Sequence, residues 1–106
     1  IVSGGENIYS TEVEAALFAH PDIIDAAVIG VPNEKYGEVV KACIVKKEGS
    51  DLTEEDVINF CKDRIASYKK PQSIDFIDEV PRNASGKVLK KVLREPYWKD
   101  QDRQVS

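Results

Sequence analysis

Residues 23–31, with the sequence IIDAAVIGV, decide the fold of this chain. All of them except Asp25 are apolar residues or glycine, several are β-branched, and the run closes at Pro32, so it predicts a largely buried strand. Residues 39–47 have the same character and predict a neighbouring strand. Only residues 32–37 connect the two runs, and so short a connection favours an antiparallel pair.

The N-terminal segment predicts a hairpin followed by a helix. Residues 1–9 place the turn composition SGGEN between two short extended pieces, which is typical of a small β-hairpin. Thr11 and Glu14 then form a capping-box pattern, with apolar residues at helical spacing behind it. The pattern predicts a helix over residues 12–19.

A second helix and a third strand follow the apolar pair. Residues 53–56, TEED, are expected to cap a helix that ends near position 66. Residues 73–78 alternate apolar and polar side chains, as an edge strand does. Because a helix connects this strand to residues 39–47, the two strands should run parallel if they are neighbours.

The C-terminal part predicts a loop, a short helix and a tail. After a loop over residues 81–86, a short amphipathic helix that begins near Val88 is expected to be ended by Pro96. Residues 99–106 are polar and are expected to form a mobile tail. Residues 1–98 would then make one α+β domain with a three-stranded mixed sheet, flanking helices and an N-terminal β-hairpin.

The composition is that of an ordinary globular domain. The 106 residues are 42% hydrophobic and 32% charged, which suits a chain with a single core. A net charge of -4 and a pI ≈ 5.0 supply no basic field for nucleic acid. No apolar run reaches the length of a membrane span. We therefore expect a soluble protein that neither binds nucleic acid nor crosses a membrane.

The cysteines and the first residue indicate the cellular compartment of the chain and its relation to a larger protein. Cys43 and Cys61 fall inside a predicted strand and a predicted helix, so both are expected to be buried thiols. So few cysteines, without a scaffold pattern, favour a reducing compartment, and the cytoplasm is the expected location. The chain begins at Ile1 and contains no methionine, so we expect it to be a fragment of a larger chain.

Ser85, Gly86 and Lys87 form the sharpest local feature. A glycine beside a lysine at the mouth of a loop can bring one ammonium group close to an anion. The tripeptide is not a phosphate-binding P-loop, because Pro81 takes the place of its first glycine and Val88 replaces the hydroxyl residue that would meet magnesium. Without further support, Lys87 is explained as a solvated lysine at the start of a helix.

Gly4 and Gly5 form the second feature. Paired glycines permit positive φ and let a ligand approach the backbone closely. Standing alone, the segment is explained as a plain turn. The lysine segment and the paired glycines indicate a function only when they are considered together with the other segments of the chain.

Six short segments occur in a fixed order along the chain: IVSGGENIY at 1–9, EVE at 12–14, VP at 31–32, YGE at 36–38, YKKP at 68–71 and PRNASGK at 81–87. Their order and spacing resemble the C-terminal domain of the adenylate-forming superfamily across nearly the whole chain. That superfamily includes acyl-CoA synthetases, peptide-synthetase adenylation domains and firefly luciferase. The form SGGENIY looks most like its fatty-acid and aryl acyl-CoA ligase branch.

The resemblance implies a role for Lys87. Members of the superfamily join a carboxylic acid to AMP, exchange AMP for a thiol, and rotate the C-terminal domain between the two half-reactions. By this match Lys87 is the catalytic residue, which contacts the carboxylate and the α-phosphate region during adenylation. A cation there offsets the repulsion between two anionic reactants, and its stabilising interaction becomes stronger as charge develops on the phosphoryl oxygens. Gly86 would let the loop approach the nucleotide.

The same resemblance implies that the hairpin serves the second half-reaction. Gly4 and Gly5 match residues that line the channel for the pantetheine arm of CoA, and Glu6 is included with them. Some relatives carry a lysine where Val2 stands, so no second catalytic lysine is assumed. Many have proline where this chain has Ser10, which affects only the entry to the helix.

For the intact enzyme, the resemblance implies ATP, Mg²⁺ and CoA as reactants and a carboxylic (fatty) acid as substrate. The implied partner is an N-terminal adenylation domain of the same chain. This fragment alone is expected to bind none of the reactants tightly and to be inactive or nearly so. Two alternatives stay open: a carrier-loading or luciferase-like adenylating enzyme, and a non-catalytic interaction domain of the same fold.

The remaining polar residues predict no metal site and no paired acid and base carboxylates. Turn and cap positions are expected for His20, Asp22, Asp25, Glu54, Glu55 and Asp56. Solvated faces, some of which could meet the CoA phosphates, are expected for Lys69, Lys70, Lys90 and Lys91. Tyr97 and Trp98 are expected to anchor the tail.

Overall fold

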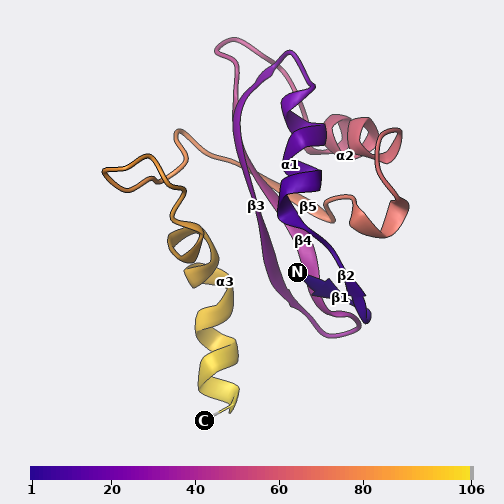
Figure 1. Cartoon of the computed structure of the whole chain (residues 1–106), viewed down its shortest axis with the longest axis vertical. Coiled ribbons are helices and arrows are strands. Elements are labelled where there is room, and N and C mark those ends of the chain that lie inside the picture. Colours follow the sequence, from indigo (N-terminus) through magenta and orange to yellow (C-terminus); the bar gives the residue numbers. More distant parts are fainter. Residues whose placement is uncertain (106) are drawn as a thin grey trace.

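The computed structural model describes residues 1–105 and the side chains of residues 1–99. In chain order its elements are β1 (Val2–Ser3), β2 (Glu6–Asn7), α1 (Ser10–Phe18), β3 (Ile23–Asn33), β4 (Gly37–Lys46), α2 (Glu54–Lys62), the 3₁₀ turn η1 (Ser67–Lys69), β5 (Ser73–Phe76) and α3 (Lys90–Val105). They form an α+β domain with an N-terminal hairpin beside a larger sheet (Figure 1). The sequence prediction of the fold class is confirmed.

The larger sheet has the strand order β3-β4-β5, with β4 in the centre. β3 and β4 pair antiparallel from Ile23 opposite Lys46 to Asn33 opposite Gly37. The turn between them is closed by the Asn33 side chain, whose Oδ1 accepts hydrogen bonds at 3.0 Å from the N–H groups of Lys35 and Tyr36. β5 runs parallel to β4. The mixed sheet and both predicted strand directions are therefore confirmed.

Helices α1 and α2 cover one face of this sheet (Figure 1). Alternate residues of β3 and β4 point toward them, because successive side chains of a strand point to opposite faces. The resulting core cluster contains Ile8, Val13, Leu17, Ile23, Ala26, Val28, Val40, Ala42, Ile44, Leu52, Val57, Cys61 and Ile74. Burial of this apolar surface is the main driving force for folding.

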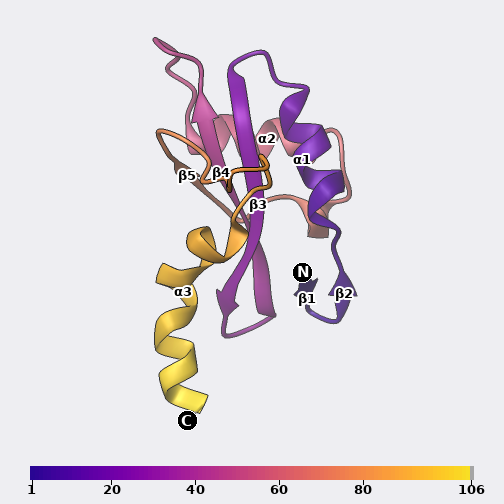
Figure 2. The same ribbon diagram turned by 60° about the vertical axis from the view of Figure 1, so that its left-hand side comes forward.

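Helix α3 lies against the opposite face (Figure 2). The intervening residues of the same two strands form a second, smaller cluster. It contains Ile29, Val31, Val39 and Cys43, with Ile77, Leu93 and Tyr97 packed against it. The sheet is thus covered on both faces, which explains why residues 23–31 are almost continuously apolar instead of alternating.

A polar network lies beneath α3 within this second interface. Lys41 is only 8% exposed, and its Nζ donates to Asp75 Oδ1 at 2.9 Å. The Tyr97 hydroxyl donates to Asp75 Oδ2, and the Lys41 ammonium lies 4.9 Å from the Tyr97 ring centroid. Partial burial would raise the pKa of the Asp75 carboxyl, but the hydrogen bonds from Tyr97 and Lys41 outweigh it and hold that pKa below its usual value.

The predicted capping box at the start of the first helix is wrong. Helix α1 begins at Ser10 and has Tyr9 as its N-cap residue, without a side-chain cap bond. Glu14 has a different partner: its Oε2 accepts the Val28 N–H at 2.9 Å. Val28 lies on β3, an edge strand whose outward N–H groups need acceptors, so the carboxylate satisfies the sheet edge and leaves the helix end without a capping box.

The expected end of the last helix at Pro96 is also wrong. Helix α3 spans Lys90–Val105, with Pro96 inside it. An internal proline removes one helical hydrogen bond and costs about 3 kcal/mol. Beyond it, Tyr97 bonds to Asp75 and the Trp98 Nε1–H donates to the Gly30 carbonyl at 2.8 Å. These aromatic anchors, which the sequence predicts, hold the helix on the sheet and offset the cost.

The tail that was expected over residues 99–106 is therefore part of α3 as far as Val105, and Ser106 lies outside the described residues. Helix α2 is shorter than expected and ends at Lys62. Its Thr53 capping box is present, with Asp56 as the reciprocal partner. Among the helices described, none has the length and apolar composition needed to cross a bilayer.

Both cysteines are buried free thiols, as predicted. Burial raises the pKa of each thiol to about 11. A thiol with so high a pKa is almost entirely protonated near neutral pH and is a poor nucleophile. Cys43 and Cys61 therefore act as apolar packing residues.

Removal of the Tyr97 hydroxyl tests the network beneath α3. We expect Tyr97→Phe to lower the free energy of unfolding by about 1–3 kcal/mol near neutral pH, because Asp75 loses a donor. The Asp75 hydrogen bond, together with burial, raises the pKa of Tyr97 from 10.0 to about 12. Between about pH 10 and pH 12 the folded chain therefore keeps the phenol proton while the unfolded chain loses it. The contribution of this hydrogen bond to the free energy of unfolding is complete below about pH 10 and is lost as the pH rises through about 12.

The measurement is urea denaturation of both proteins between about pH 8 and pH 12. The stability difference between wild type and Tyr97→Phe should shrink above about pH 10. A difference that stays constant over the whole range would contradict the assignment of this hydrogen bond.

Candidate functional site

Lys87 lies in a small hairpin between β5 and α3, three residues before the helix begins. Arg82 and Val88 form an isolated antiparallel bridge at its base. Asn83 closes the turn, because its Oδ1 accepts from the N–H groups of Ser85 and Lys87, both at 3.0 Å. Gly86 has φ +87°, a conformation that glycine adopts without strain. The expected position of Lys87 at a helix start is therefore wrong: a tight turn presents it.

Two ion pairs hold the base of this Lys87 hairpin. Arg82 Nη2 donates to both oxygens of Asp25 at 2.9 Å. After the hairpin, Lys90 Nζ lies 2.8 Å from Ser10 Oγ and 3.0 Å from Glu14 Oε2. The first pair attaches the hairpin to the start of β3 and the second attaches the start of α3 to α1. Residues 83–87 are exposed, while the base of the hairpin is fixed.

These contacts correct three expectations about charged residues. Asp25 was expected to be a turn residue but is the Arg82 partner. Lys90 was expected on a solvated face but pairs with Glu14, and Lys69 pairs with Glu12 at 2.8 Å. No local signal in the sequence could have found these pairs, because the partners lie 57 or more residues apart.

The N-terminal hairpin presents Gly4 and Gly5 at its turn. β1 and β2 pair antiparallel, with Val2 opposite Asn7 and Ser3 opposite Glu6. Gly4 has φ +57° and Gly5 φ +86°. A Cβ on Gly5 would have no heavy atom within 4 Å, so the space before this glycine is open within the domain. Glu6 is exposed on β2.

The turn between β3 and β4 and the start of β4 hold this hairpin in place. The Gly4 N–H donates to the Tyr36 carbonyl at 2.9 Å. The Val2 N–H donates to Glu38 Oε1 at 2.7 Å. A Cβ on Gly4 would lie 3.1 Å from the Tyr36 ring, so a side chain there would crowd the ring. Sequence reasoning noted the YGE segment but did not assign it this role.

The two predicted site segments lie far apart. The Lys87 hairpin is attached at Asp25, near the first residue of β3, whereas the glycine hairpin is attached just beyond Asn33, its last residue. Asn33 lies eight positions after Asp25, and at about 3.3 Å per residue this is roughly 26 Å. Figures 1 and 2 agree that the two loops lie at different ends of the sheet. The structure does not bring Lys87 and Gly86 together with Gly4, Gly5 and Glu6.

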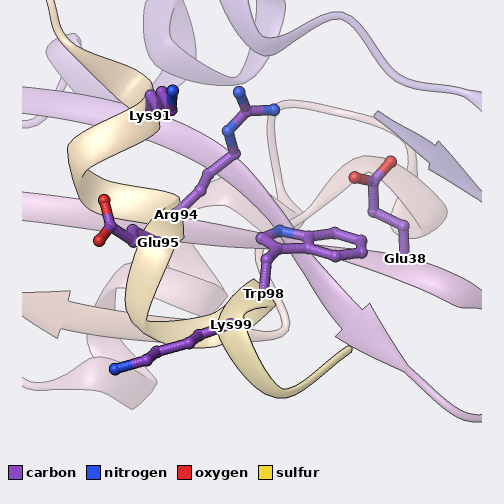
Figure 3. A pocket seen from close by; sticks show the side chains of 6 residues that line it. All are labelled: Glu38, Lys91, Arg94, Glu95, Trp98 and Lys99. Carbon is purple, nitrogen blue, oxygen red and sulfur yellow. The ribbon is translucent and has the colours of Figure 1, made fainter. Parts of the chain in front are cut away.

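A hollow of about 770 Å³ lies beside α3 (Figure 3). Its lining residues are Glu38, Lys91, Arg94, Glu95, Trp98 and Lys99. None of the predicted site residues is among them. The described residues contain no group of three or more histidine, cysteine, aspartate or glutamate side chains that could hold a metal ion.

Comparison with known proteins identifies the family to which this domain belongs. Residues 12–87 match the family model of the AMP-binding enzyme C-terminal domain. A methyl-dioxo-octahydro-indenyl-propanoyl:CoA ligase of Rhodococcus jostii is 53% identical over 94 residues, which are 89% of this chain and 18% of the ligase. The long-chain-fatty-acid–CoA ligase FadD13 of Mycobacterium tuberculosis is 42% identical over 97 residues, 92% of this chain and 19% of the ligase.

Among solved structures, ATP-bound MatB from Rhodopseudomonas palustris superposes with a TM-score of 0.88 at 39% identity, covering 95% of this chain and 20% of MatB. The fold thus occurs in a domain that adenylate-forming enzymes carry. This chain belongs to the family of AMP-binding enzyme C-terminal domains. It spans about a fifth of the length of the relatives that it matches.

Proposed function

We propose that this chain is the C-terminal domain of an ATP-dependent acyl-CoA synthetase. The intact enzyme would activate a carboxylic acid as acyl-AMP and then form the CoA thioester. The observation that carries the proposal is the family match together with an exposed lysine on a hairpin whose base is fixed. Residues 1–98 would be the functional domain.

Lys87 would act in the first half-reaction. Lys87 is exposed and directly follows the turn, so its side chain can enter an active site that lies on another domain. Between the acid and the nucleotide it would offset the repulsion of the two anions and stabilise the charge that develops on the phosphoryl oxygens. Gly86 keeps the turn narrow at the point where it would approach the nucleotide.

Gly4, Gly5 and Glu6 would act in the second half-reaction. The space before Gly5 is open within this domain, so its backbone can form one wall of a channel for the pantetheine arm of CoA. Because the two hairpins lie at different ends of the sheet, one active site cannot receive both at once in a single orientation. A rotation of the domain between half-reactions would present each in turn.

The reactants of the intact enzyme would be ATP with Mg²⁺, a carboxylic acid and CoA, and the partner would be an adenylation domain N-terminal to this chain. The Rhodococcus jostii and Mycobacterium tuberculosis relatives are CoA ligases by name, which favours CoA over a carrier protein as the acceptor. The reaction would take place in the cytoplasm. The domain alone would be inactive or nearly so, because most of the groups that position the reactants lie elsewhere.

Replacement of the Lys87 ammonium tests the first role. In the full-length parent enzyme we expect Lys87→Ala to slow acyl-AMP formation by about 100-fold or more, because the charge that stabilises the transition state is lost. Thioester formation from supplied acyl-AMP should be spared. Pyrophosphate release and acyl-CoA formation measure the two steps separately, and Lys62→Ala, an exposed lysine at the end of α2, is the control. Equal loss of both steps would contradict the division of roles.

A side chain on Gly5 tests the second role. We expect Gly5→Leu to block thioester formation from supplied acyl-AMP and to leave adenylation intact, because the leucine would enter the channel. Gly49→Leu is the matched control, since Gly49 also has positive φ and open space before it but lies in the turn after β4. Normal use of CoA by Gly5→Leu would remove the hairpin from the channel.

A further inference from the structure

Gly30 is an unexpected residue in β3. It lies in the interior of an eleven-residue strand, where glycine costs conformational entropy and contributes no packing. Its φ is not positive, so the backbone conformation does not require glycine. The reason for a glycine at this position must therefore be space.

Glu38 occupies that space. A Cβ on Gly30 would lie 2.3 Å from Oε2, 2.5 Å from Cδ and 2.8 Å from Cγ of Glu38. These separations are far below the roughly 3.5–4.0 Å of a favourable contact between carbon atoms. Glu38 lies on β4, diagonally across from Gly30, which pairs with Val40. The missing side chain thus lets the carboxylate of Glu38 lie across β3.

From this position Glu38 reaches the glycine hairpin. Its Oε1 accepts the Val2 N–H at 2.7 Å, and the second attachment is the bond from the Gly4 N–H to the Tyr36 carbonyl. The Tyr36 bond uses a main-chain carbonyl that any residue supplies, whereas the Glu38 bond depends on the side chain. Ile8 anchors the base of the hairpin in the core, and the two hydrogen bonds hold β1 and the turn, so loss of the Glu38 bond loosens β1. On the far side, Trp98 binds the Gly30 carbonyl, and its ring extends toward Glu38 (Figure 3).

We propose that Glu38, seated over Gly30, is a positioning residue that fixes the glycine hairpin for the thioester-forming step. This inference rests on the proposed function, because that proposal assigns the hairpin to the thioester-forming step. It assigns no contact with substrate to Glu38. The residue acts through the orientation of Gly4 and Gly5.

Two variants on different strands should share one effect. In the full-length parent enzyme, Glu38→Ala removes the acceptor, and Gly30→Ala displaces it, because a Cβ there would overlap Cγ, Cδ and Oε2 of the Glu38 side chain. We expect each to slow thioester formation from supplied acyl-AMP by about 10- to 100-fold, as a small misplacement does, and to leave adenylation within about twofold. The Gly30→Ala/Glu38→Ala double variant should be no slower than Glu38→Ala.

Two further variants separate the hydrogen bond from general structural effects. Glu38→Gln keeps an oxygen at the same reach and should restore most of the thioester rate. Glu48→Ala removes an exposed glutamate just beyond the other end of β4 and should change neither step. Thermal unfolding of every variant identifies any that fails to fold. If Gly30→Ala fails to fold, the Glu38 variants still test the proposal.

Hydrogen exchange of the hairpin gives a readout that does not depend on catalysis. In the full-length enzyme, a peptide over residues 1–9 should exchange faster in Glu38→Ala and Gly30→Ala than in Glu38→Gln or Glu48→Ala. Unchanged exchange, or a Glu38→Gln variant as slow in thioester formation as Glu38→Ala, would overturn the proposal. Faster exchange with a normal thioester rate would also overturn it, while leaving the proposed function intact if Gly5→Leu still disables that step. A normal thioester rate in Gly5→Leu as well would overturn both this inference and the proposed role of the hairpin in the CoA channel.

Discussion

The antiparallel pairing of β3 with β4 is the constraint on which the rest of the domain depends. It runs without interruption from Asp25 opposite Val45 to Asn33 opposite Gly37 and supplies both faces of the core. Helices α1 and α2 pack on one face and α3 on the other, so neither face is left to water. Because the strands are buried on both sides, a slip in register would break two apolar clusters at once, and the register is strongly specified.

This rigid pair also sets the distance between the two hairpins. The Lys87 hairpin is attached at the start of β3, and the glycine hairpin is attached at the turn into β4. The Lys87 hairpin is held by an ion pair at its base, and the glycine hairpin is held by Glu38 at β1 and by the Tyr36 carbonyl at its turn. A domain of this design can carry two reactive loops in a fixed relation, and it can change the loop in use only by turning as a body. That physical property is what the proposed two-step chemistry would need.

Features set by local sequence could be predicted, and features set by distant contacts could not. The strands, their directions and the Thr53 capping box follow from short patterns. The capping role given to Glu14 was wrong because its carboxylate serves Val28 on another element, and the helix end placed at Pro96 was wrong because Tyr97 and Trp98 hold α3 to the sheet. The candidate site residues were identified from the resemblance to the family. Glu38 could be identified only from the structure, because its side chain occupies the space beside Gly30 and so accounts for a glycine in the middle of a strand.

The central claim is that the two hairpins keep one fixed separation while the domain changes its orientation. Pulsed electron paramagnetic resonance between spin labels at Asn7→Cys and Ala84→Cys in the full-length enzyme measures that separation directly, since both positions are exposed and both native thiols of this domain are buried. The account predicts the same distance with ATP and acid as with CoA bound, while the distance from either label to one on the N-terminal domain changes. Hairpins that approach each other between the two states would contradict it.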